Sequence, residues 1–105
     1  MNEAPIQNLN VIDIFGNRKD GGIDLCIIIS GYLDSSEEHE SILRQKIQNY
    51  VNTVFSDEWE QEHKGKAVSI LLKATEVPHP NILNLIDAIK KHLEEFNVEL
   101  RLENA

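Results

Sequence analysis

The sequence predicts an α/β fold, more narrowly an α+β two-layer sandwich with a four-stranded mixed sheet and both helices on one face. Three observations lead to this prediction. Apolar runs of strand length alternate with longer stretches in which apolar residues recur at helical spacing. Segments rich in glycine, asparagine and proline separate them. The chain has 105 residues and 41% hydrophobic residues, which suits one globular domain with one core. The predicted order is β-β-α-β-α-β.

We expect residues 1–105 to form a single domain, with residues 1–9 as a flexible N-terminal segment and residues 10–103 as the folded core. The first two strands are predicted at residues 10–15, "NVIDIF", and 22–29, "GIDLCIII". Between them "GNRKDGG" has the composition of a loop. The two strands are therefore expected to form an antiparallel hairpin.

A helix is predicted to follow this hairpin. Ser35 and Glu38 stand in the S-x-x-E relation of a capping box, and an apolar stripe runs from Ile42 to Phe55. A helix that reached His63 would be much longer than the strands beside it. Two alternatives follow: the helix breaks near Ser56, which would cap a second short helix, or its last turns extend beyond the sheet.

The second half of the chain continues with a strand at residues 66–74, a proline-containing loop and a helix that begins at Pro80. Asn97 is expected to end that helix in a left-handed conformation, and residues 98–103 form the last strand. Helical connections favour parallel neighbours, so the hairpin should supply the only antiparallel pair, with the second and third strands central. The outer sheet face is expected to carry a mixed set of residues: Asp13, Asp24, Cys26, Ile28, Ser69, Leu71, Glu99 and Arg101.

The net charge of −8 is unevenly distributed. Residues 34–63 contain eight acids and two bases, Arg44 and Lys46. Nucleic acids are bound mainly by neutralising phosphates, so we expect no nucleic-acid partner, and a charged protein partner should be basic. The negative charge also serves solubility. With one cysteine, no basic-then-apolar leader and no apolar run of membrane-spanning length, the sequence predicts a cytoplasmic protein without membrane association.

Catalytic and metal-binding patterns are weak in this sequence. His39 stands among acids, but only Ser35, Ser36, Ile42 and Leu43 are three or four positions away, which makes a solvated first helical turn the better interpretation. "WEQEH", which ends at His63, lacks the second histidine of a zincin motif. The glycines form no dinucleotide or phosphate-loop pattern, and Cys26 lies in an apolar strand that favours an inert thiol. We therefore expect no cofactor and no catalytic residue.

The strongest candidate for a binding site is the stretch around the sole tryptophan, Trp59. It is surrounded by Asp57, Glu58, Glu60 and Glu62, and a large aromatic residue inside a charged rim is a frequent anchor of protein interfaces. The alternative is that Trp59, four residues after Phe55, covers the end of the core. These five residues are the predicted partner-binding set.

Together these observations predict a non-enzymatic cytoplasmic protein-interaction domain that binds a basic protein through the acidic helix end. One concrete version is an immunity-like role, in which carboxylates cover a basic toxin. The alternative is a small enzyme or metal-binding protein whose site assembles from His39, His63 or His79 and dispersed acids after folding. A homodimer through the open sheet face is a third hypothesis.

Three segments also support a family resemblance: "VIDIF", "IDLCIIISGYLD" leading into "LRQKIQNYVNTVFS", and a terminal strand after a short second helix. Over residues 10–103 the chain resembles a family of small bacterial proteins that is known as a domain of unknown function. The resemblance implies the fold but no catalytic residue and no substrate.

Overall fold

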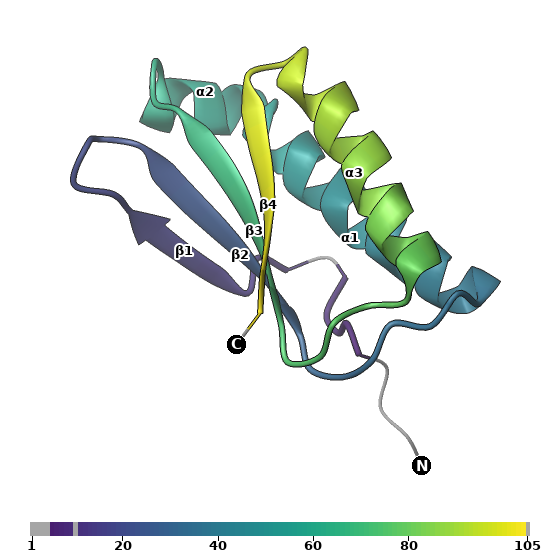
Figure 1. Cartoon of the computed structure of the whole chain (residues 1–105). Helices are drawn as coiled ribbons and strands as arrows, with labels where there is room; N and C mark the ends of the chain where they lie inside the picture. Colours follow the sequence, from purple (N-terminus) through teal and green to yellow (C-terminus); the bar gives the residue numbers. More distant parts are fainter. Residues whose placement is uncertain (1–4, 10, 105) are drawn as a thin grey trace.

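The computed structural model of the chain describes residues 5–9 and 11–104 (Figure 1). The elements follow in the order β1 (Ile14–Asn17), β2 (Ile23–Ile29), α1 (Glu37–Val54), α2 (Asp57–His63), β3 (Val68–Ala74), α3 (Pro80–Glu94) and β4 (Val98–Asn104). This order confirms the predicted elements and adds α2. Of the two alternatives for the end of the first helix, the break near Ser56 is the one observed.

The four strands form one mixed sheet in the order β1-β2-β3-β4. Strand β1 is antiparallel to β2, whereas β2 pairs with β3 and β3 with β4 in parallel. The predicted mixed sheet, its antiparallel hairpin and its two central strands are therefore confirmed. The most apolar strands lie in the middle because only there can both of their edges and both of their faces leave water.

The core lies between the sheet and the long helices. Alternate residues of the strands, such as Leu25 and Ile70, are fully buried in one cluster with Tyr50 of α1 and Ile82 of α3. The same cluster takes in most of the apolar stripe predicted from Ile42 to Phe55, but Phe55 itself is exposed. Figure 1 shows α1 and α3 running along the sheet, and residues of both helices line one groove.

The first strand begins later than predicted. Asn10 lies outside the described residues, and β1 spans Ile14–Asn17 instead of 10–15, so it takes two residues from the predicted loop. The backbone groups of the preceding residues are used elsewhere: the N–H of Val11 donates to the carbonyl of Asn8 at 2.9 Å, and the N–H of Asp13 donates to the Tyr50 hydroxyl at 2.7 Å. These groups are not available for a sheet ladder.

The cap of α1 lies one residue beyond the predicted one. The N-cap is Ser36, whose hydroxyl accepts from the N–H of His39 at 3.2 Å. The prediction of Ser35 with Glu38 was therefore wrong by one position: the N–H of Ser36 donates to the Asp34 carboxylate at 2.9 Å, and the Nδ1 of His39 accepts from the N–H of Asp34 at 2.9 Å. A histidine in this place is not part of the capping-box pattern.

The start of the described chain packs against the folded core, within the segment that the sequence predicts to be flexible. Residues 1–4 lie outside the described part. Ile6 is only 2% exposed and belongs to the core cluster, and the carbonyl of Pro5 accepts from the N–H of Ser30 at 2.8 Å. Burial of Ile6 contributes about 1.5–3 kcal/mol, and the carbonyls of Gln7 and Asn8, which accept from the Lys46 ammonium, attach the segment further.

Candidate protein-interaction surface

The five residues of the predicted partner-binding set all lie on α2, and Ser56 separates this helix from α1. The Ser56 hydroxyl donates to the carbonyl of Thr53 at 2.7 Å, at the end of α1. The same oxygen accepts from the N–H of Trp59 at 3.3 Å and so caps α2. One serine thus satisfies a terminal group of each helix and turns the chain between them.

The carboxylates of α2 point into solvent. Asp57, Glu58, Glu60 and Glu62 are all exposed, and the helix has no buried residue. Among the described residues, no salt bridge joins Asp57, Glu58 or Glu60 to a base. Glu62 has only a 3.6 Å contact with the imidazole of its neighbour His63. The negative charge of α2 is therefore available to an external partner.

Trp59 is partly buried and packs against the core. Its ring lies 4.4 Å from the ring of His63 and 5.8 Å, edge to face, from that of Phe15 in β1. The Phe15 side chain remains 43% exposed. Sequence reasoning did not include Phe15 or His63 in the site. The i, i+4 spacing of Trp59 and His63 was the available signal for one of them, whereas the contact with β1 depends on tertiary structure.

A groove separates α1 from α3 on the far side of the helix layer from the sheet. It has a volume of about 540 Å³ and is lined by, among others, Ile47, Val51, Phe55, Ala88, Ile89 and Phe96. At one end the rings of Phe55 and Phe96 meet edge to face at 5.7 Å, although they are 52% and 48% exposed. Two exposed phenylalanines over an apolar floor are unusual on the outer side of a helix layer.

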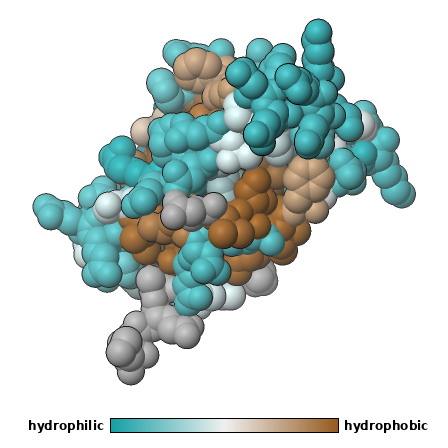
Figure 2. Space-filling view, turned by 180° about the vertical axis from the view of Figure 1, so that it is seen from behind, coloured by the Kyte–Doolittle hydropathy of each residue, from teal (hydrophilic) through white to brown (hydrophobic). Residues whose placement is uncertain are grey.

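A second hollow connects this groove with α2. It has a volume of about 340 Å³ and shares Phe55 and Phe96 with the groove, and it is also lined by Trp59, Glu60 and Lys66. The groove, the phenylalanine pair and α2 are therefore contiguous. Apolar exposure alone does not single out this region, since Figure 2 shows apolar surface in the middle of the face seen there as well. What distinguishes this region is that exposed apolar side chains lie next to the exposed carboxylates of α2.

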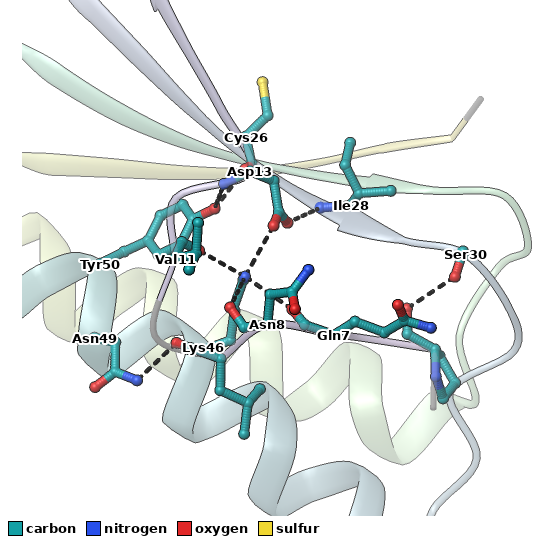
Figure 3. Close-up of polar contacts among 12 residues, drawn as sticks. Gln7, Asn8, Val11, Asp13, Cys26, Ile28, Ser30, Lys46, Asn49 and Tyr50 are labelled. Atoms are coloured by element: carbon teal, nitrogen blue, oxygen red, sulfur yellow. Dashed lines mark hydrogen bonds and ion pairs between the residues drawn. The ribbon is translucent and has the colours of Figure 1, made fainter. Parts of the chain in front are cut away.

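The most polar cluster in the interior surrounds Lys46 (Figure 3). Its side chain is 0% exposed, and its ammonium contacts the carbonyls of Gln7 at 3.0 Å, Asn8 at 2.7 Å and Val11 at 2.8 Å. The carboxylate of Asp13 lies 2.9 Å away. Every donor of the buried ammonium has an acceptor, as buried charge requires. This cluster fastens Gln7, Asn8, Val11 and Asp13 to α1, and nothing in the sequence pattern indicated it.

Tyr50 extends the same cluster toward the sheet. Its hydroxyl donates to the carbonyl of Cys26 at 2.7 Å and accepts from the N–H of Asp13. Burial raises the pKa of Tyr50 to about 12, so the phenol stays neutral. The other carboxylate oxygen of Asp13 accepts from the N–H of Ile28 at 2.9 Å. Asp13 and Asp24 therefore do not face each other as a catalytic carboxylate pair.

On the outer face of the sheet, pairs of oppositely charged side chains surround a small group of buried apolar residues. Arg18 lies 3.6 Å from the carboxylate of Asp24 and donates to the Ser69 hydroxyl at 3.3 Å. Further along, Lys73 pairs with Glu103 at 3.9 Å. Cys26 and Leu71, which the sequence placed on this face, are nearly buried, in keeping with long charged side chains that cover apolar surface. Homodimerisation through this face stays a prediction.

The three histidines of the alternative metal-site hypothesis have local roles. His39 completes the cap of α1, with its Nδ1 also 3.1 Å from the Asp34 carboxylate, so this acid does not point away as its spacing suggested. His79 caps α3 by accepting from the N–H of Asn81 at 3.0 Å, and His63 stacks on Trp59. In the described part of the chain, no three His, Cys, Asp or Glu side chains gather as metal ligands would.

Burial raises the pKa of the Cys26 thiol, which agrees with the inert cysteine that the sequence indicated. Within residues 5–9 and 11–104, no helix is both long and apolar enough to span a bilayer.

By its fold, the chain is an α+β domain with a four-stranded mixed sheet. Residues 4–105 match a family of unknown function, DUF6572, and the chain belongs to this family. The resemblance seen in the sequence is thereby confirmed. A search of the curated proteins and a search of the solved structures gave no match.

Proposed function

We propose that this chain is a non-enzymatic cytoplasmic protein-interaction domain that binds a basic protein through α2, with Trp59 as the central contact. The observation that carries the proposal is the set of exposed α2 carboxylates around a partly buried aromatic cluster. Interface anchors are typically aromatic side chains that are already held in place and ringed by polar groups. An immunity-like role, in which the carboxylates cover a basic toxin, is the concrete version of this proposal.

The aromatic cluster around Trp59 and the carboxylates of α2 have separate roles in this proposal. Phe15 and His63 fix the Trp59 ring in one orientation, so little side-chain freedom is lost when a partner packs on it. Within the described part of the chain, Asp57, Glu58 and Glu60 form no salt bridge, so a basic partner does not compete with ion pairs there. Charge of this kind accelerates association and selects against acidic partners.

A capture experiment with defined variants tests the proposal. The tagged protein is incubated with lysate of its source organism at low and high salt, and retained proteins are identified by mass spectrometry. We expect a basic protein that binds the wild type, is released as salt shortens the Debye length from about 10 Å to about 3 Å, and is lost in the triple variant Glu58→Lys/Glu60→Lys/Glu62→Lys.

The matched control is Glu76→Lys/Asp87→Lys/Glu99→Lys. These residues are exposed, and their reversal changes the net charge by the same amount at another place. Trp59→Ala should weaken capture at least about tenfold, the effect of one interface hot spot, whereas Trp59→Phe should retain part of it. Equal capture by wild type and both triple variants would refute the proposal.

A further inference from the structure

The edge of the sheet at β4 is open to a further strand. β4 is the last strand in the sheet order, and its seven residues pair with β3 in unbroken register. Within the described part of the chain, these residues make no backbone hydrogen bond outside the sheet ladder. The N–H and C=O groups that point away from β3 can therefore bond to a strand of another molecule.

β4 has little protection against such pairing. Proteins usually protect an edge by proline, a bulge, a very short strand or charged side chains. Of these β4 has only charged side chains, and they lie on its outer face, because Val98, Leu100 and Leu102 point to the core side. The opposite edge is less suited to pairing, since β1 has four residues and contains Gly16.

The charges of β4 select one arrangement of two identical strands. Glu99, Arg101 and Glu103 alternate in sign along the outer face. A twofold axis makes two copies of an edge strand antiparallel, and side chains that lie directly opposite then share a face. With Arg101 on the axis, arginine would face arginine and glutamate would face glutamate. With Leu100 on the axis, each Glu99 faces the partner's Arg101.

A hollow beside β4 fits the same arrangement. It has a volume of about 240 Å³ and is lined by residues 97–100 and by Lys90 and Glu94 of α3. With Leu100 on the axis, the partner's Leu102 lies opposite Val98, on the side of the sheet that faces α3. Leu102 is partly exposed in the free chain, so its burial in the hollow stabilises the pair. An axis at Leu102 would also pair opposite charges, but it would place no leucine there.

Charge around this edge is balanced, in contrast to the net charge of −8 of the whole chain. Three bases and three acids are found on β4, in the hollow and beside them: Lys73, Lys90, Arg101, Glu94, Glu99 and Glu103. Glu99 and Arg101 lie 2.9 Å apart, and their side chains are still 50% and 47% exposed. Two copies paired about Leu100 therefore form a ring of four alternating charges.

We infer that two copies of this chain pair along β4, antiparallel and with Leu100 on the twofold axis, which joins their sheets into one continuous sheet. The contact is the edge of the sheet and not its open face. It goes beyond the proposed function and does not depend on it, because α2 contributes no residue to the hollow at β4. One strand from each copy makes a small interface, so we expect a weak dimer.

Sedimentation equilibrium from about 1 μM to about 1 mM tests the inference, and the wild type should pass from monomer to dimer in this range. Glu99→Arg places arginine opposite arginine, and Arg101→Glu places glutamate opposite glutamate. Each variant alone should weaken dimerisation at least about tenfold. An equimolar mixture of the two variants restores opposite charges at both positions, and its heterodimer should be about as stable as the wild-type dimer.

Glu103→Arg is the matched control, because it makes the same change of charge on the same face of β4. In the inferred arrangement Glu103 lies opposite the partner's Asn97, so this variant should dimerise as the wild type does. Circular dichroism verifies that each variant is folded. Recovery of dimer in the mixture also shows that both chains are competent.

Four results would overturn the inference: a wild type that stays monomeric, a dimer that neither variant weakens, a mixture that does not recover, or a dimer lost in Glu103→Arg but not in Glu99→Arg. None of them affects the proposed function. Conversely, the capture control that contains Glu99→Lys should be monomeric and should still retain the basic protein, because capture requires only α2.

Discussion

Replacement of Lys46 by methionine should destabilise the fold strongly, because it removes the centre of the buried polar cluster and leaves its acceptors behind. Methionine has a similar length and fills the space, so the loss concerns hydrogen bonds and charge rather than volume. The Asp13 carboxylate and the carbonyls of Gln7, Asn8 and Val11 would all lose a partner within 3.0 Å.

The expected cost follows from the geometry. Removal of one partner from a buried ion pair costs about 3–5 kcal/mol. The Asp13 side chain is 17% exposed, so water can reach part of the abandoned carboxylate, and the lower end of this range applies. We expect Lys46→Met to reduce the free energy of unfolding by about 3 kcal/mol, which for a domain of this size lowers Tm by about 12–24 °C.

Urea unfolding followed by circular dichroism measures this difference, with Lys91→Met as the control. Lys91 is an exposed lysine in an i, i+4 pair with Asp87, and its replacement should change stability by less than about 0.5 kcal/mol. In a double-mutant cycle with Asp13→Asn, the two substitutions should be clearly non-additive. A cost of Lys46→Met below about 1 kcal/mol, or strict additivity with Asp13→Asn, would refute the reasoning.

Three further predictions concern single groups. Ser36→Ala should reduce the free energy of unfolding by about 1 kcal/mol through loss of the α1 cap, while Ser35→Ala should leave it nearly unchanged; equal effects in urea unfolding would contradict the assigned cap. The pKa of Tyr50 is raised to about 12, so its contribution to stability is present below pH ~10 and is lost as pH rises toward 12; tyrosinate absorbance should show one tyrosine that ionises only as the protein unfolds, and Tyr50→Phe should remove that step. Hydrogen bonds from the hydroxyl and N–H of Ser36 lower the pKa of Asp34, so its contribution is present above pH ~3.9 and is lost as pH falls further; Asp34→Asn should flatten acid unfolding there, and an unchanged acid limb would contradict this.

Periodic apolar patterns explain why most of the fold could be predicted. The stripe from Ile42 to Phe55 specifies a helix face, and the near-continuous run of β2 specifies a central strand, because each pattern reports which side of an element leaves water. The end of the first helix was left open because both alternatives bury the same stripe. What decides it is a local contact, the Ser56 hydroxyl between Thr53 and Trp59.

The errors have a different physical origin. The cap was assigned to Ser35 because Glu38 completes a known pattern, whereas in the structure the Asp34 carboxylate accepts from the N–H of the true cap, Ser36, and His39 accepts from the N–H of Asp34. The first strand was placed too early because Ile12 and Ile14 alternate, although the carbonyl of Val11 and the N–H of Asp13 are bound by side chains from α1. Such side-chain competition with the sheet has no signature in hydrophobic periodicity.

The predicted site was recovered only in part by sequence reasoning. Helical structure for the carboxylates and Trp59 could be predicted from the sequence, but whether they lie on a separate short helix or on the last turns of the first one was left open. The aromatic neighbours of Trp59 could not be predicted. Phe15 and Phe96 are more than 35 residues from Trp59 in the sequence, and they come near it only because separate elements pack together. The buried role of Lys46 escaped for the same reason, since a lysine in an acidic stretch normally stays in solvent.

The contacts of Lys46 with Gln7, Asn8 and Val11 bear on which amino acids these positions accept. Its three carbonyl acceptors belong to the main chain, and every amino acid offers the same oxygen. At these three positions the attachment therefore depends on the path of the backbone, whereas at Asp13 it depends on the carboxylate side chain. Among the three residues that supply these carbonyls, Asn8, with its φ of 53°, is restricted to residues that tolerate a left-handed conformation.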